Sequence, residues 1–183
     1  MVEGKEAQPA RDGTGALFHR RYQARFSDAR MTPRELMAFV KANLASLAPA
    51  QLADFKKWHG HPWVMKVGDE YDITIFGPWN GAVRVVEVGE TSFTLLTLKG
   101  HPEAGHIRFT LEEDPGMPGV LCFRIESWAR SRDGLVQLAY SSLKLGQMVQ
   151  ERVWVTFCKR VVKYSGGRQL GKVEVVTEEL GRG

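Results

Sequence analysis

The sequence predicts an α+β domain of the helix-grip type: a curved antiparallel sheet wrapped around one long C-terminal helix, with two short helices after the first strand. Two patterns lead to this prediction. Apolar and polar residues alternate with period two over residues 68–130, whereas apolar residues recur at helical spacing over residues 135–164. A chain of 183 residues, 43% hydrophobic and 25% charged, is long enough to bury one core.

We expect three parts along the chain: a flexible arm over residues 1–15, a single helix-grip domain over residues 16–167 and a short tail over residues 168–183. The arm is rich in glycine, alanine and charged residues and has no apolar periodicity. The tail holds a strand-like run at residues 173–176, for which we predict no element. The fold should therefore be built from the middle part alone.

The domain opens with a strand and two short helices. Residues 20–26 alternate in polarity and predict the first strand. Thr32 is a candidate N-cap, Pro33 suits the first helical position, and Glu35 completes a capping box. A second short helix is expected after Pro49, with three inward-facing residues: Leu52, Phe55 and Trp58.

Five predicted strands follow, at residues 71–75, 83–88, 92–98, 106–112 and 120–130. The turn signals between them are strong. Asn80-Gly81 is typical of a β-hairpin, and the loop after Asp114 contains two prolines and two glycines. Short loops between consecutive strands indicate an antiparallel meander.

The last predicted element is the long helix at residues 135–164, which ends at Gly166 and Gly167. Its apolar stripe is formed by Leu138, Leu145, Val149, Val153, Phe157 and Val161. One such helix can cover the concave face of a curved sheet and leave a cavity between them. In this architecture, that cavity is the default ligand site.

The net charge of +4 is the remainder of two opposed blocks. Residues 68–126 hold four Lys and Arg against ten Asp and Glu, whereas residues 127–167 hold seven against two. We therefore expect an acidic sheet and a basic helix that attract each other. Because Lys and Arg are not concentrated on one element, nucleic acid is not an expected partner.

Several protein classes are excluded by composition and motif. No run approaches the roughly 18 apolar residues that span a bilayer, and the N-terminus has no apolar signal segment. Cys122 and Cys158 form no CxxC pair, which favours a reducing compartment and predicts a cytoplasmic protein. The GxSxG, P-loop and GxGxxG patterns do not occur, so we expect no cofactor.

The loop before the fourth of these strands carries a motif of the form T-L-x-G-H-P-E-x-G, formed by Thr97, Leu98, Gly100, His101, Pro102, Glu103 and Gly105. A V-G-D motif ends upstream at Asp69, an S-R pair ends downstream at Arg132, and Gln150 lies in the last helix. In these motifs, residues 67–164 resemble the family of domain of unknown function nineteen-ninety, placed in the START/polyketide-cyclase-like helix-grip superfamily. The resemblance implies a fold and a pocket rather than an activity. The chain departs from the usual family pattern at His106, Ile107 and Asp133.

His101 and Glu103 are the main polar candidates. An imidazole close to a carboxylate can act as an acid–base pair or hold a polar ligand head at a cavity mouth. The alternative is structural: Pro102 restricts φ, Gly100 and Gly105 supply unusual backbone angles, and the side chains cap amides. Both interpretations stay open at the level of sequence.

The remaining reactive side chains are weaker candidates. His59, His61 and His106 are possible metal ligands, but no further ligand follows at a characteristic spacing, so we expect no metal. Cys158 is expected to be a buried, inert thiol.

These observations favour a binding module for a small hydrophobic or amphipathic ligand. The predicted pocket residues are Phe93, Leu95, Phe123, Ile125, Leu145, Val149 and Phe157, with His101, Glu103 and Arg132 as polar gatekeepers. Two alternatives are a cyclase- or hydrolase-like enzyme that uses His101 and Glu103, and a homodimeric interaction protein. The sequence leaves open the ligand, any reaction and the oligomeric state.

Overall fold

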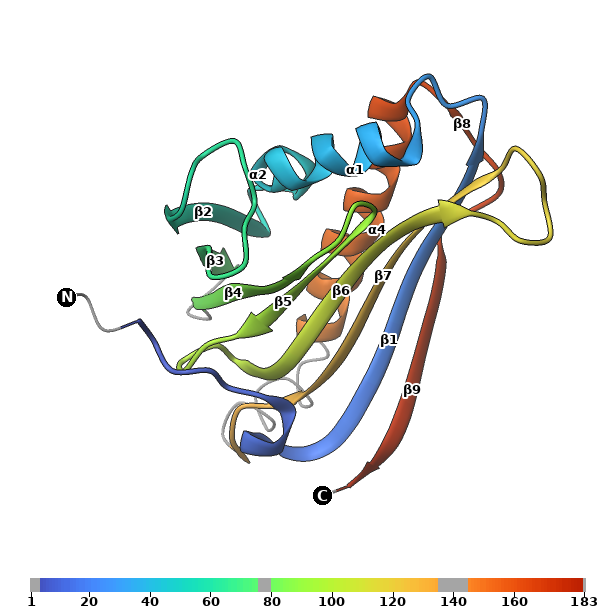
Figure 1. The fold of residues 1–183 in the computed structure, drawn as a ribbon. Coiled ribbons are helices and arrows are strands. Elements are labelled where there is room, and N and C mark those ends of the chain that lie inside the picture. Colours follow the sequence, from blue (N-terminus) through green and yellow to red (C-terminus); the bar gives the residue numbers. More distant parts are fainter. Residues whose placement is uncertain (1–3, 76–79, 135–144, 183) are drawn as a thin grey trace.

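The computed structural model describes residues 4–75, 80–134 and 145–182, and it confirms the predicted fold class. Its described residues form a curved, fully antiparallel sheet of nine strands wrapped around one long helix, α4 (Figure 1). The elements are η1 Ala10–Asp12, β1 Thr14–Ser27, α1 Pro33–Ala42, α2 Leu44–Leu47, β2 Ala53–His59, β3 Glu70–Ile75, β4 Gly81–Val88, β5 Ser92–Thr97, β6 Glu103–Glu113, β7 Leu121–Ser131, α4 Leu145–Ser165, β8 Arg168–Gln169 and β9 Glu174–Arg182.

The first strand of the chain lies inside the sheet rather than at its edge. The order is β2-β3-β4-β5-β6-β7-β1, and both β8 and β9 pair with the other side of β1. The strands β2 to β7 form the predicted meander, because each pairs with the next along the chain. None of the described helices is long and apolar enough to cross a membrane.

The second short helix is not where the sequence placed it. Helix α2 precedes Pro49, and the segment after Pro49 is strand β2, in which Phe55 pairs with Ile73 of β3. Residues 53–56 also alternate in polarity, so the pattern fits a strand as well as a helix, and pairing with β3 decides the outcome. Phe55 is buried as expected, whereas Trp58 is exposed.

The arm and the tail are both parts of the sheet. Within the arm, Ala7 forms a bridge to Leu98, Gln8 is buried, and β1 already begins at Thr14. In the tail, β9 pairs with β1 over eight positions, from Ala16 with Arg182 to Gln23 with Glu174. The expected boundaries at residues 15 and 168 therefore do not separate packed from unpacked chain.

Both helix ends that the sequence identified are present. Glu35 N–H donates to Thr32 Oγ1 at 3.2 Å and Thr32 N–H donates to Glu35 Oε2 at 2.9 Å, which is the predicted capping box of α1. Helix α4 ends at Ser165 and is followed by Gly166 with a φ of 73°. Residues 135–144 of the predicted long helix lie outside the described residues.

Candidate functional site

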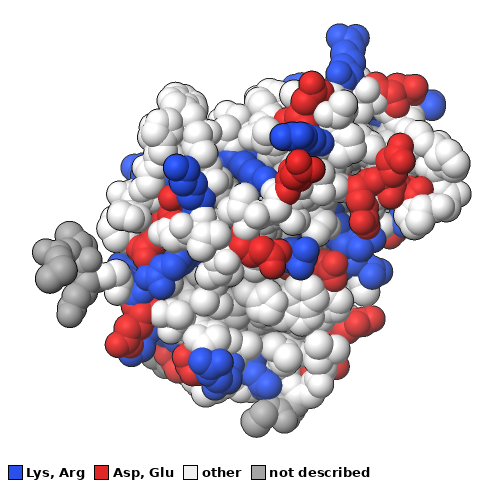
Figure 2. Space-filling view, in the orientation of Figure 1, with Lys and Arg blue, Asp and Glu red and all other residues white. Residues whose placement is uncertain are grey.

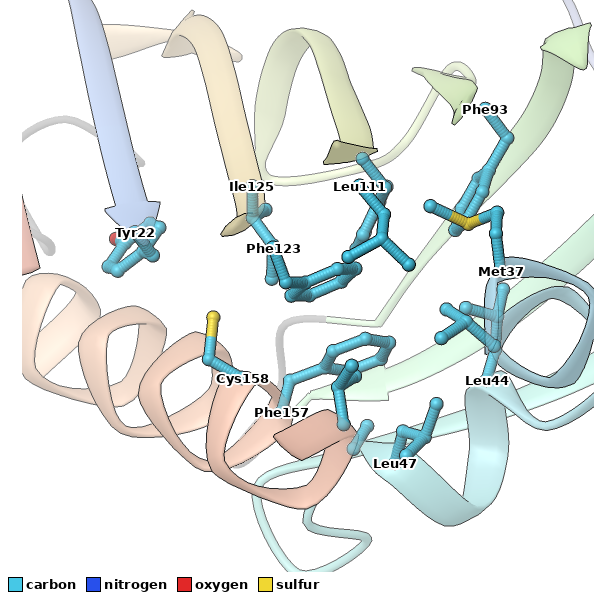
Figure 3. Close-up of a cluster of buried hydrophobic side chains, with 14 of the residues drawn as sticks. Tyr22, Met37, Leu44, Leu47, Phe93, Leu111, Phe123, Ile125, Phe157 and Cys158 are labelled. Carbon is cyan, nitrogen blue, oxygen red and sulfur yellow. The ribbon is translucent and has the colours of Figure 1, made fainter. Parts of the chain in front are cut away.

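The concave side of the sheet is filled at one end by aromatic side chains. Phe93 of β5 stacks on Phe109 of β6, with ring centroids 4.4 Å apart, and Phe157 of α4 packs on Phe123 of β7 at 6.0 Å. Figure 3 shows Phe157 directed from α4 toward this cluster, with Leu44 and Leu47 closing it from the side. This end is a packed core without room for a ligand.

The inward-facing side chains become smaller toward the other end of β6 and β7. The paired positions, from the large end to the small end, are Leu111 with Phe123, Phe109 with Ile125, Ile107 with Ser127 and Gly105 with Ala129. The facing stripe of α4 narrows in the same direction, through Phe157, Val153, Val149 and Gly146. Because close-packed interiors leave space only where side chains are too small to fill it, this taper leaves a cavity.

The cavity has a volume of about 100 Å³ and lies between the sheet and the first half of α4. Strands β2 to β7 and helix α4 supply its apolar lining, including Phe55, Ile73, Leu95, Val149 and Trp154. Six polar residues are spread over the same lining, namely Thr97, His101, Glu103, His106, Ser127 and Gln150. An apolar space with a few polar groups is the usual composition of a small-molecule site.

The motif loop is held in place by the N-terminal arm. The Gln8 side-chain amide donates to the carbonyls of His101 and Glu103, at 2.9 and 2.8 Å, and its oxygen accepts from Gly100 N–H. Thr97 Oγ1 donates to the Gln8 carbonyl at 2.7 Å and accepts from Gly105 N–H. These hydrogen bonds fix the backbone of the motif loop, which gives the loop a structural role.

The His101 ring is held by the backbone of Glu103. Its Nδ1 lies 3.0 Å from the Glu103 nitrogen and 3.1 Å from the Glu103 carbonyl oxygen, so it accepts from the N–H in one neutral tautomer and donates to the carbonyl in the other. Burial lowers the pKa of His101 below its ordinary 6.5, although the nearby Glu103 opposes this shift. The ring packs against Gly81, where a Cβ would lie 2.3 Å from its Cδ2. His101 is thus a neutral polar group in the cavity wall.

The Glu103 carboxylate is engaged by Arg20 of β1, whose Nη1 lies 3.4 Å from Glu103 Oε1. The Arg20 side chain is only 9% exposed, and its buried Nε has no hydrogen-bond partner. Arg20 is paired in register with Ser127, which lines the cavity. Arg20 is not itself a lining residue of the cavity, and its contact with the site runs through Glu103, which is one. Sequence reasoning missed this residue, although Arg20 shares the inward face of β1 with Tyr22 and Phe26.

The predicted pocket residues separate into two groups. Leu95, Val149, His101 and Glu103 line the cavity. The buried core holds Phe93, Phe123, Ile125 and Phe157 instead. Arg132 supports the motif loop, since its N–H donates to the Pro102 carbonyl at 2.8 Å and its side chain reaches the Gly100 carbonyl. The side chain of Leu145 lies outside the described residues.

The other reactive side chains form no second site. His59 ends β2 and His61 lies in the loop after it, and neither lines the cavity. His106 does line the cavity, and its ring stacks on Trp128 at 5.0 Å. Within the described part of the chain, no three His, Cys, Asp or Glu side chains are grouped so that they could hold a metal. Cys158 is fully buried in the core, and burial raises the pKa of its thiol, which disfavours the reactive thiolate.

The residues that make the cavity were missed because they are small. Gly105, Ser127, Ala129 and Gly146 attract no attention as chemistry, yet their positions decide where space remains. At Gly105 a Cβ would lie 2.0 Å from the Trp128 carbonyl oxygen, so a larger residue would also disrupt the contact between β6 and β7. The available signal was a fall in side-chain size along the inward-facing positions of two paired strands.

Comparison with known proteins gives a family and a fold. The family model described as "Domain of unknown function (DUF1990)" matches residues 14–160. No curated protein matches the chain.

Three solved structures have a similar fold at low sequence identity. One is a conserved protein from Geobacillus kaustophilus, with a TM-score of 0.51 and 11% identity over 84% of this chain and 99% of that one. Another is a hypothetical protein from Helicobacter pylori, with a TM-score of 0.54 and 10% identity over 79% and 86%. The third is norcoclaurine synthase from Thalictrum flavum in complex with dopamine and hydroxybenzaldehyde, with a TM-score of 0.51 and 11% identity over 90% and 96%. At these identities, the TM-scores show a shared fold and nothing beyond it.

Proposed function

The chain belongs to the DUF1990 family, and from this premise we propose that it is a binding module for a small apolar or amphipathic molecule. The observation that carries the proposal is the cavity formed where the inward-facing side chains of β6, β7 and α4 become small together. The ligand's apolar part lies between the sheet and α4. Its polar end lies near His101, Glu103 and Arg20.

The size of the cavity restricts the ligand class. Sites for drug-sized ligands enclose about 300–1,000 Å³, whereas an engineered cavity of about 150 Å³ takes benzene. A cavity of about 100 Å³ therefore suits one small ring or a short branched chain. The norcoclaurine synthase structure, which holds dopamine and hydroxybenzaldehyde, supports including single-ring compounds among the ligands to be tested.

The polar end favours a ligand that carries a hydrogen-bond acceptor. His101 presents a polar ring to the cavity, and Arg20 stands behind the lining residue Glu103 with a buried, unpaired Nε. An acceptor that reaches the Arg20 guanidinium gains a charge-assisted hydrogen bond in a water-poor site. We therefore expect single-ring carboxylates to bind more tightly than the corresponding uncharged hydrocarbons.

The contacts of Glu103 weigh against the acid–base enzyme. Its carboxylate faces Arg20, and His101 Nδ1 is occupied by the Glu103 backbone. An acid–base pair needs groups that can exchange protons with a substrate, whereas these two are engaged in holding the loop. The enzyme alternative predicts that His101→Ala abolishes an activity with little loss of thermal stability; the binding module predicts a clear loss of stability. The two buried free thiols fit the reducing, cytoplasmic setting that we propose for the protein.

The proposal is tested by thermal shift and native mass spectrometry with a panel of single-ring carboxylates, their amides and the parent hydrocarbons. The wild type should gain melting temperature with the carboxylates and show a one-to-one complex. Ser127→Leu, which fills the cavity, should lose this response. Thr110→Leu is the matched control, because Thr110 lies on β6 between Ser92 and Arg124 and does not line the cavity.

Two results would count against the proposal. One is a flat response of the wild type across the whole panel. The other is an equal response of the wild type and Ser127→Leu, since binding would then occur away from the cavity.

A further inference from the structure

The β2–β3 loop exposes an unusual set of large apolar side chains. Trp63 is 70% exposed and Val67 64%, and Trp58 and Val64 are also exposed. We call these four side chains the apolar tip. The loop stands clear of the sheet in Figure 1, and the lobe at the same position in Figure 2 is mostly white. Contiguous exposed apolar side chains on a folded domain indicate an interaction surface.

The loop is held by a buried ion pair. Lys57 Nζ lies 2.9 Å from Asp69 Oδ2, and the two side chains are 10% and 8% exposed. The same ammonium donates to the carbonyls of His61 and Val64, at 2.7 and 3.0 Å. Asp69 also accepts from Lys66 N–H at 2.9 Å. Asp69 of the V-G-D motif thus fixes the backbone on both sides of Trp63, so the apolar tip is a pre-formed feature.

The charge around the apolar tip has one sign. Residues 56–68 contain Lys56, Lys57, Lys66 and two histidines, and no aspartate or glutamate. Lys57 is neutralised by Asp69, whereas Lys56 and Lys66 are exposed. Of the acidic residues just beyond, Glu70 pairs with Arg84 and Asp72 pairs with Lys5.

The exposed apolar side chains and the exposed lysines together indicate which kind of partner the apolar tip binds. A two-fold contact between two copies through the apolar tip would bring two positively charged surfaces together, which is repulsive. Tryptophan is enriched at the membrane–water interface, where its ring is apolar and its N–H stays hydrated. Exposed lysines beside it gain energy near anionic headgroups. We propose that the apolar tip docks the protein on an anionic lipid bilayer, with Trp63 inserted at the headgroup level.

The test uses the full chain and vesicles of phosphatidylcholine with about 30% phosphatidylserine. Binding is measured by co-flotation and by quenching of tryptophan fluorescence with acyl-brominated lipid. The wild type should bind and be quenched. Trp63→Ala should weaken partitioning about tenfold, the loss expected for one large buried apolar side chain. Leu180→Ala is the matched control, since Leu180 is 52% exposed on β9, and it should bind like the wild type.

Substitution of the two exposed lysines provides a second test of the proposal. Lys56→Gln and Lys66→Gln should each weaken binding to the anionic vesicles about fivefold and leave binding to pure phosphatidylcholine unchanged. Absence of wild-type binding overturns the proposal, as does an equal loss in Trp63→Ala and Leu180→Ala. A concentration-dependent dimer that Trp63→Ala dissolves would also overturn it, in favour of a protein partner. The inference is independent of the cavity ligand, because no ligand is added and Trp63→Ala leaves the cavity intact.

Discussion

At the scale of single residues, His101 combines a structural and a binding role. Its Nδ1 contacts the backbone of Glu103 and so holds the motif loop, while the ring lines the cavity. Because the ring is buried, its charged form is disfavoured in the folded protein.

This role predicts a pH dependence of stability. Burial lowers the pKa of His101 in the folded protein, so the unfolded chain takes up the proton first as the pH falls. The stabilisation by the neutral ring is complete above the ordinary pKa of 6.5 and declines below it. His101→Asn, whose amide oxygen can accept the Glu103 N–H, does not titrate there.

The measurement is urea denaturation from about pH 7 to about pH 5. The difference in unfolding free energy between the wild type and His101→Asn should shrink as the pH falls. Parallel curves for the two proteins would contradict the burial of a neutral His101 ring. Glu103 and Arg132 are the charged groups that act on this ring, and they are present in both proteins.

Sequence reasoning succeeded at this scale where a residue has a distinctive type. His101 and Glu103 were placed in a loop near the cavity, and both line it. The space between the sheet and α4 also holds four predicted pocket residues that belong to the packed core, namely Phe93, Phe123, Ile125 and Phe157. Sequence alone does not say at which end of this space each one lies. Arg20 was missed because an arginine in a strand is ordinarily assigned to the solvent face.

At the scale of elements, the β2–β3 loop depends on one buried ion pair. Asp69→Asn should destabilise the protein by about 3 kcal/mol, because it leaves the Lys57 ammonium buried without a counter-charge. Asp72→Asn is the matched control, three residues further along in strand β3. Its pair with Lys5 is exposed, and such pairs contribute about 0–1 kcal/mol.

Chemical denaturation of the two variants checks this prediction. Equal and small losses would show that the Lys57–Asp69 pair does not organise the loop. A second check is Gly60→Ala, since a Cβ at Gly60 would lie 2.2 Å from Asp69 Oδ1 and Gly60 has a φ of 113°. Gly60→Ala should lose stability because the added Cβ displaces the Asp69 carboxylate and because alanine is strained at this φ.

The elements themselves were predictable where one pattern dominates. The capping box of α1 and the meander from β3 to β7 follow from local signals. Strand β2 was assigned to a helix because its apolar residues fit both periods. Strand β9 was not predicted because it is stabilised by pairing with β1, about 150 positions earlier in the chain. A local sequence pattern does not show pairing between strands so far apart in the chain.

At the scale of the whole molecule, charge is balanced within the sheet. The expected attraction between an acidic sheet and a basic helix is not built from ion pairs. Those found in the described residues join strands, loops, the arm and α1, as in Arg84 with Glu70 and Arg34 with Glu90. The reason is geometric, because α4 covers the concave, apolar face while strand charges lie on the opposite face. Figure 2 accordingly shows blue and red groups interleaved.

The fold class was accessible from sequence because it depends on the order and period of elements. The cavity was not accessible from sequence, because it forms only where small residues of two strands and one helix lie opposite one another in the fold.

A methyl NMR titration with the single-ring carboxylate that gives the largest thermal shift tests the cavity most directly. We predict intermolecular contacts to the methyl groups of Leu95, Val149 and Val153, and their loss in Ser127→Leu. Saturable contacts only to methyl groups on the outer strand, such as Val176 and Leu180, or no saturable binding at all, would contradict it.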